Sequence, residues 1–215
     1  LASNDKPFVF DASGESVYGI NLKVKFLDEN NYKIKNALVI LCRDYSFHDT
    51  TNNDSHINIH PPKLTKESSI SFQLVFLKSY FSPAFLTSFL TYKITGNYYE
   101  WLMKEFIEHR TVNIDRIDNY CQILEQEKEI TETPDNYYKN REQLFYKRPD
   151  VERMDSVKQI FPAQAKMLKE IAAVFKKQGT DYKVIVGPLY DQIKLNKHDF
   201  NTLKEIFGDN VFDFT

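Results

Sequence analysis

The sequence predicts an α/β fold, namely a doubly wound and mostly parallel sheet with a long, mainly helical insertion. Two observations carry this prediction. Apolar runs alternate with segments of helical periodicity at both ends of the 215-residue chain, as in parallel sheets joined by crossover helices. Residues 46–150 lack this alternation and are rich in Tyr, Phe, Asn, Lys and Glu. We therefore expect a single domain over residues 1–215, with residues 46–150 as its insertion.

The first elements are predicted to form a βαβ unit. Residues 7–11 are a short apolar run before a Ser-Gly turn, which is typical of a buried strand. The next segment has one apolar helical face, and charged residues such as Lys23 lie mostly off it; the face consists of Val17, Ile20, Val24 and Leu27. Residues 37–42 are a second apolar run. Strand, helix and strand in this order predict a parallel pair with a right-handed crossover.

The far end of the chain repeats the alternation. Residues 155–177 predict a long amphipathic helix, in which Pro162 marks either a kink or the true start. Residues 182–187 predict a strand, residues 196–207 a second helix, and residues 211–214 a last strand. The tail is therefore expected to read helix, strand, helix, strand.

The insertion is predicted to contain helices around residues 69–90, 97–110 and 115–130, followed by an exposed connection over 131–150. Its most apolar stretch, residues 69–92, contains no run of the roughly 18 apolar residues that a membrane helix needs. We expect a buried or interfacial segment there, and no membrane span.

Composition excludes several classes. Lys and Arg number 28 against 30 Asp and Glu, a net charge of -2, which argues against a generally basic nucleic-acid binder. The two cysteines exclude a disulfide framework and a four-cysteine zinc site. The histidines at 48, 56 and 60 lie in a loop without fixed geometry, so we expect neither a metal site nor a cofactor.

Three loops are candidates for a functional site, because ligands of open parallel sheets bind beyond the carboxyl ends of the strands. They are residues 11–16, 43–49 and 188–192. In the first loop, Gly14 lets the backbone turn, so that the following N–H groups can face an anion or an oxyanion. The alternative is a simple turn in which Ser13 or Ser16 caps the helix.

The other two loops carry charged and polar side chains. Arg43 could bind an anion and Asp44 could orient a base, whereas the alternative is a local ion pair in an exposed loop. Tyr190 and Asp191 suit a polar ligand, with capping of the loop by Asp191 as the alternative. The candidate site residues beside Gly14 are therefore Ser13, Arg43, Asp44, Tyr190 and Asp191.

Several of these segments resemble SGNH-hydrolase-like proteins, including the envelope-associated relatives of the DltD and alginate O-acetylation types. The resemblance rests on residues 13–16, 35–41, 184–190 and 211–214, and extends over residues 7–48 and 155–215 but not the insertion. It implies a three-layer α/β/α fold with the flavodoxin-like strand order 2-1-3-4-5. It also implies a hydrolase or acyltransferase acting on O-acyl esters of cell-envelope carbohydrate, with carbohydrate or acylated polysaccharide as partner and a cell-envelope or secreted location.

The resemblance also implies roles for single residues. Gly14 matches the oxyanion-hole glycine, and residues 43–45 stand where the family has an Asn, which this sequence lacks. The family's Ser strand is expected upstream of Leu1 and its Asp-His pair downstream of Thr215, so the catalytic residues are not assigned. That Ser strand would be central, between the strands at 7–11 and 37–42, and a sheet without it would have a hole.

Two other functions fit the residues. A non-catalytic binding or scaffold module of the same fold would explain the absence of the Ser, Asn and Asp-His motifs. A phosphatase of the haloacid-dehalogenase kind would use Asp11 as nucleophile, since residues 8–14 resemble its strand-Asp-x-Asp-Gly start. In that motif the second Asp is replaced by Ser13.

Overall fold

The computed structural model of the chain describes residues 8–10, 14–52, 55, 59–97, 99, 112–114, 121–144, 147, 151 and 153–215. These residues fall into two compact units. The first unit takes in the described residues within Asp11–Glu67 and Arg148–Thr215. The second takes in those within Ala2–Phe10 and Ser68–Lys147.

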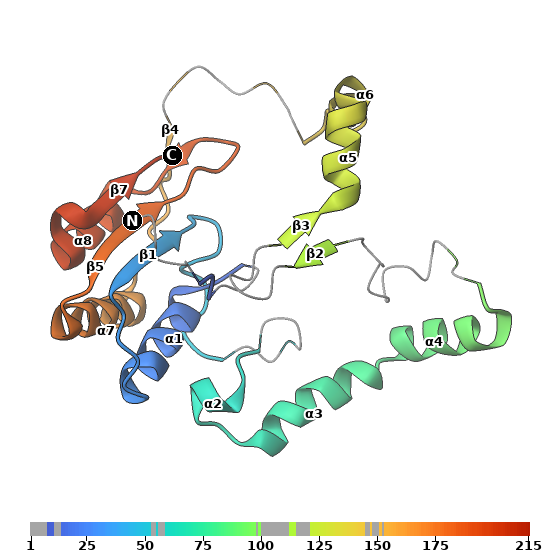
Figure 1. The fold of residues 1–215 in the computed structure, drawn as a ribbon, viewed down its shortest axis with the longest axis horizontal. Coiled ribbons are helices and arrows are strands. Elements are labelled where there is room, and N and C mark those ends of the chain that lie inside the picture. The colour runs from blue at the N-terminus through green and yellow to red at the C-terminus, as the bar shows by residue number, and fades with distance from the viewer. Residues whose placement is uncertain are drawn as a thin grey trace. The chain divides into compact units, whose positions relative to one another are not determined.

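The first unit contains a parallel sheet of three strands (Figure 1). The strands are β1 (Asn36–Leu41), β5 (Asp181–Val186) and β7 (Val211–Asp213), in the order β1-β5-β7. Both pairs are parallel, with Leu41 opposite Val186 and Val184 opposite Val211. The predicted α/β class is therefore confirmed, and each strand lies within one residue of the apolar run that predicted it.

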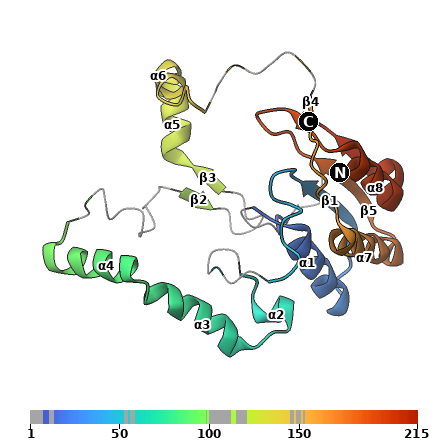
Figure 2. The same cartoon turned by 180° about the vertical axis from the view of Figure 1, so that it is seen from behind.

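Three helices accompany this sheet: α1 (Val17–Glu29), α7 (Pro162–Gln178) and α8 (Lys197–Phe207). Figure 2, seen from behind, shows α1 beside α7. Pro162 is the first residue of α7, where its missing N–H costs nothing, so it marks the true start of the helix. One hydrophobic core joins the three helices to one face of the sheet; its sheet residues are Val39, Leu41, Val184, Val186 and Val211.

Apolar side chains on the opposite face of the sheet are exposed. Leu38 and Ile40 alternate with the buried residues of β1 and are 56% and 59% exposed. Phe212 of β7 is 38% exposed, and the ammonium group of Lys183 lies over its ring, 5.4 Å from the centroid. Alternation along a strand places these side chains on the face away from the core.

The first unit also contains elements that the periodicity did not predict. These are the short helix α2 (Pro62–Thr65), the strands β4 (Arg153–Met154) and β6 (Ile193–Lys194), and the 3-10 turn η2 (Gly208–Asn210). β4 and β6 form a separate parallel pair. A pair of two-residue strands has no periodicity to detect, because alternation needs at least about four residues.

The second unit contains α3 (Ser69–Tyr80), α4 (Pro83–Thr95), β2 (Val112–Ile114), β3 (Cys121–Ile123), α5 (Leu124–Glu132) and α6 (Pro134–Lys139). The helix predicted over 69–90 is thus two helices. Ser82 caps the second one by accepting a hydrogen bond from the Phe85 N–H at 3.2 Å, and Pro83 occupies its first turn.

The other predictions for the insertion concern residues 97–110, 115–130 and 131–150. Most of the helix expected over 97–110 lies outside the described residues. Of 115–130, the described part is strand β3 followed by α5. The connection over 131–150 is largely exposed as expected, but it is not irregular, because α6 forms within it. Pro134 starts that helix, a position in which its missing N–H leaves no helical hydrogen bond unmade.

The strand predicted over 7–11 is not formed at Phe8–Phe10, the part of it that is described. These side chains are 67%, 41% and 40% exposed, and the segment belongs to the second unit. The predicted βαβ unit is therefore wrong as to its first strand. Apolar composition alone does not decide whether so short a run forms a strand, because tertiary context outweighs strand propensity. The place expected for the family's Ser strand is the other edge of β1, away from β5, and no described strand lies there.

Among the described residues, none of the helices has by itself the length and apolarity needed to cross a bilayer.

Candidate functional site

The second and third predicted loops meet where β1 and β5 end. Arg43 follows β1, and its Nη2 donates to Asp191 Oδ2 at 2.7 Å, across 148 positions of sequence. Its Nε also donates to Asp44 Oδ1, at 2.8 Å. Arg153 joins the cluster by donating from Nη2 to the carbonyl oxygen of Asp191 at 2.8 Å. Three candidate residues from two separate loops, Arg43 and Asp44 of the second and Asp191 of the third, are therefore bonded through Arg43.

Burial and pairing act in opposite directions on these charges. Burial by itself lowers the pKa of Arg43, but the hydrogen bonds to Asp191 and Asp44 outweigh it and raise that pKa. Burial raises the pKa of Asp191, and the bonds from Arg43 and the Ile193 N–H outweigh it, so this pKa lies below its usual value. Both groups are thus held in their charged forms.

The first and second loops are joined through Ser46, which is 1% exposed. Its Oγ accepts a hydrogen bond from the Cys42 N–H at 2.8 Å and donates to the Glu15 carbonyl oxygen at 3.2 Å. The Val17 N–H donates to the Ser46 carbonyl oxygen at 2.7 Å. One buried serine therefore ties the start of α1 to the end of β1. All three predicted loops are connected, through Ser46 on one side and Arg43 on the other.

Gly14 has a φ of 67°, and a Cβ at this position would meet no atom within 4 Å. The turn requires a left-handed backbone, and the space beside it is open. Ser16 is the N-cap of α1, since its Oγ accepts from the Gly19 N–H at 3.3 Å. Of the other candidates, Tyr190 is 43% exposed. Ser13 and Asp11 lie outside the described residues, so the haloacid-dehalogenase alternative gains no support.

A buried charged cluster beside these loops was missed by sequence reasoning. Glu15 and Lys23 form an ion pair in which both side chains are 9% exposed. His60 Nε2 lies 3.9 Å from Glu15 Oε1, and burial lowers the pKa of His60. Gly19 leaves room for this arrangement, because a Cβ there would overlap the Glu15 carboxylate and lie 2.5 Å from His60 Cε1.

The prediction that Lys23 lies off the buried face of its helix is therefore wrong. The signal that was available is the glycine one turn before Lys23, which leaves a gap in the helix surface for a polar group. The partners Glu15 and His60 lie outside the helix, so the periodicity of the helix does not predict their contact with Lys23.

A cleft of about 520 Å³ opens at the cluster formed by the second and third loops. Its lining combines two arginines with two carboxylates and a hydroxyl, from Arg43, Asp44, Arg153, Asp155 and Ser156, with Met154 and Ile193 beside them. Clefts at this edge of a parallel sheet are the usual ligand sites of such folds. We therefore take this cleft and the Gly14 turn as the candidate functional site.

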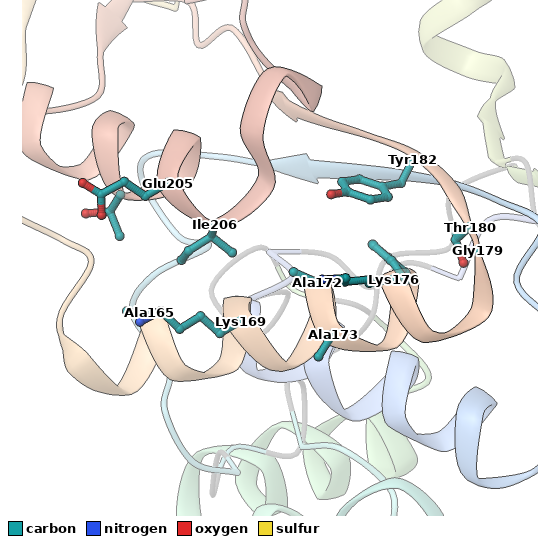
Figure 3. A pocket seen from close by; sticks show the side chains of 12 residues that line it. Ala165, Lys169, Ala172, Ala173, Lys176, Gly179, Thr180, Tyr182, Glu205 and Ile206 are labelled. Atoms are coloured by element: carbon teal, nitrogen blue, oxygen red, sulfur yellow. The ribbon is translucent and has the colours of Figure 1, made fainter.

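A second hollow, of about 630 Å³, lies between α7 and α8 (Figure 3). The figure shows the Tyr182 ring over the small side chains of α7, with Ile206 of α8 beside it. Thr180 directly precedes β5 and Tyr182 lies at its amino end, which is the edge opposite to the paired loops. Its lining mixes alanines with Lys169, Lys176 and Glu205, and none of the three loops selected from the sequence contributes to it.

Within the described ranges, no three His, Cys, Asp or Glu side chains group closely enough to hold a metal ion. His56 of the predicted histidine loop lies outside those ranges, whereas His60 belongs to the Glu15 cluster.

Comparison of the chain with protein-family models, with curated proteins and with solved structures finds no match. The assignment of function therefore rests on the fold and on the contacts described above.

Proposed function

We propose that the chain is an SGNH-like hydrolase or acyltransferase domain acting on O-acyl esters of cell-envelope carbohydrate, with a cell-envelope or secreted location. One observation carries the proposal. The three loops selected from the sequence are bonded together at one edge of the sheet, through Ser46 and through the Arg43–Asp191 pair. A shared edge of this kind is where an α/β hydrolase of doubly wound topology assembles its site.

The strand order supports the finer fold. In the order 2-1-3-4-5, the third, fourth and fifth strands are neighbours, and β1, β5 and β7 have this arrangement. The loop after β1 then takes the place of the family's Asn block. The apolar face that exposes Leu38 and Ile40 is also consistent with a three-layer fold, because parallel sheets are generally covered on both faces.

The chemistry proposed for this edge follows the family's mechanism. A Ser attacks the ester carbonyl, a His takes the proton of that Ser, and an Asp orients the His. The family's motifs assign these three residues to no position in residues 1–215. What this chain would supply is a backbone N–H at the Gly14 turn for the oxyanion, worth about 3 kcal/mol. The paired Arg43 and Asp191 would hold the neighbouring loops in place.

A test combines a covalent probe with a binding measurement. A fluorophosphonate probe labels an activated serine, and release of acetate from an acetylated polysaccharide reports hydrolysis. We expect the Gly14→Ala variant to lower turnover about tenfold or more, since small misplacements of catalytic groups are costly. Gly179→Ala is the matched control, because Gly179 has a φ of 66° and equally open surroundings but lies at the end of α7.

The second candidate is a non-catalytic binding module, and the pairing of Arg43 favours it. Both carboxylates beside that guanidinium already neutralise it, so the loop is organised without any substrate. Binding of the acetylated polysaccharide without labelling or hydrolysis would support this candidate against the enzyme. Absence of labelling, hydrolysis and binding would refute both.

A further inference from the structure

The helices α3 and α4 expose an unusual amount of apolar surface. Along α3 and the residue after it, one stripe at helical spacing consists of Ile70, Leu74, Leu77 and Phe81, which are 73%, 56%, 50% and 65% exposed. On α4, Leu90 and Ile94 are 55% and 82% exposed. Contiguous apolar surface of this kind marks an interaction site.

The charges of this segment are all of one sign. Residues 69–95 contain no Asp or Glu, and their only charged side chains are Lys78 and Lys93. Both lysines are exposed. The segment therefore carries a charge of +2 in a chain whose net charge is -2. A surface that is apolar and exclusively cationic is complementary to one that is apolar and anionic.

The dimensions of the two helices suit one leaflet of a bilayer. At about 1.5 Å per residue, each helix is about 20 Å long, against a half-thickness of about 15 Å for the hydrocarbon core. Neither helix is long and apolar enough to span a bilayer alone. The two helices taken together are, with a bend of 59° between Tyr80 and Pro83. Such a bend allows the pair to enter and leave one side of a membrane.

We propose that α3 and α4 form a lipid-binding surface that inserts into one leaflet of a membrane rich in anionic lipids. The stripe from Ile70 to Phe81, with Leu90 and Ile94, would enter the acyl boundary, and Lys78 and Lys93 would contact the head groups. Tyr80 lies at the bend and is 59% exposed, and aromatic rings favour the membrane interface. This inference does not depend on the proposed enzymatic function.

The experiment is co-flotation of the full chain with vesicles of phosphatidylcholine alone or mixed with phosphatidylglycerol. We expect binding to the anionic vesicles to exceed binding to the neutral ones by about tenfold or more. Lys78→Gln with Lys93→Gln should reduce the anionic binding by about 25-fold, at about 1 kcal/mol per cation. Leu74→Gln with Leu90→Gln should reduce it about 100-fold, or about tenfold per leucine.

The matched control is Leu144→Gln with Val157→Gln, because these residues are similarly exposed, at 60% and 62%, but lie elsewhere. Circular dichroism checks that every variant is folded. A second readout is the fluorescence of a Leu90→Trp variant. This variant also carries Trp101→Phe, because Trp101 is the chain's only tryptophan and would otherwise contribute to the signal. Brominated lipids should quench its fluorescence.

Three results would overturn the proposal. The first is no binding of the folded chain to anionic vesicles, and the second is equal binding by the leucine variant and its control. The third is self-association, measured by light scattering, of a chain that does not bind the vesicles, provided that Leu74→Gln with Leu90→Gln abolishes this self-association. That last outcome would assign the stripe to a second copy of the chain.

Discussion

Replacing Ser46 by alanine tests the connection between the first two loops of the candidate site. The substitution removes only the hydroxyl oxygen, which accepts from the Cys42 N–H at 2.8 Å and donates to the Glu15 carbonyl at 3.2 Å. Ser46 is 1% exposed and Cys42 is 7% exposed. Water therefore has little access to the groups left behind.

The expected magnitude follows from those two bonds. A buried N–H left without an acceptor costs about 1–3 kcal/mol, and a lost neutral hydrogen bond about 1 kcal/mol. The Glu15 carbonyl is the less demanding of the two groups, because buried carbonyls tolerate loss of a partner better than buried N–H groups do. We expect Ser46→Ala to lower the free energy of unfolding by about 2 kcal/mol.

Urea unfolding followed by circular dichroism measures this change, and hydrogen exchange of the Cys42 amide localises it. With a typical slope of about 2 kcal/mol per molar urea, the midpoint should fall by about 1 M. Ser69→Ala is the control, since Ser69 is exposed at the start of α3, and we expect a change within about 0.5 kcal/mol. A loss below about 0.5 kcal/mol for Ser46→Ala, with unchanged exchange at Cys42, would refute the connection.

Two further predictions concern the charged clusters. The folded pKa of Asp191 is lowered, so its contribution to stability is present above the unfolded pKa of about 3.9 and is lost as the pH falls through the folded value. Acid titration of unfolding should show a shallower slope below about pH 4 for Asp191→Asn, and an unchanged slope would contradict the pairing with Arg43. Gly19→Ala would gain about 1 kcal/mol of helix propensity in α1. The added Cβ would collide with the buried Glu15 carboxylate and with His60, so we expect net destabilisation by about 1–2 kcal/mol. Thermal unfolding measures this change. A variant more stable than the unchanged chain would show that the Glu15 carboxylate moves aside freely.

The helices of the first unit could be predicted because their signals are local. Ser16 was one of two expected caps for α1, and its hydroxyl accepts from Gly19. Pro162 begins α7, and Gly179 ends it with a φ of 66°. Each of these residues acts on backbone groups within a turn of itself, so its effect can be derived from neighbours in the sequence.

The strands show where local signals stop. Phe8–Phe10 and the β1 segment are both short apolar runs, yet of these two only the β1 segment forms a strand, paired with β5. Apolar composition favours burial and extended backbone, but hydrogen-bond partners for a strand come from another part of the chain. The helix α6 is a different case, because Pro134 in its first turn is a local signal that the prediction of an exposed connection over 131–150 did not use.

For the candidate site, sequence alone determined which loops to consider, because the carboxyl ends of parallel strands share an edge. It also determined the residue types there, including Gly14, whose φ of 67° satisfies a turn that favours glycine. Tertiary structure decided which charges meet. Arg43 and Asp191 are 148 positions apart, and Lys23 is buried only because Glu15 receives it. A charged side chain can be buried at an acceptable free-energy cost only when folding brings an opposite charge close to it. The distance between the two charges depends on the tertiary fold, so the local sequence does not predict it.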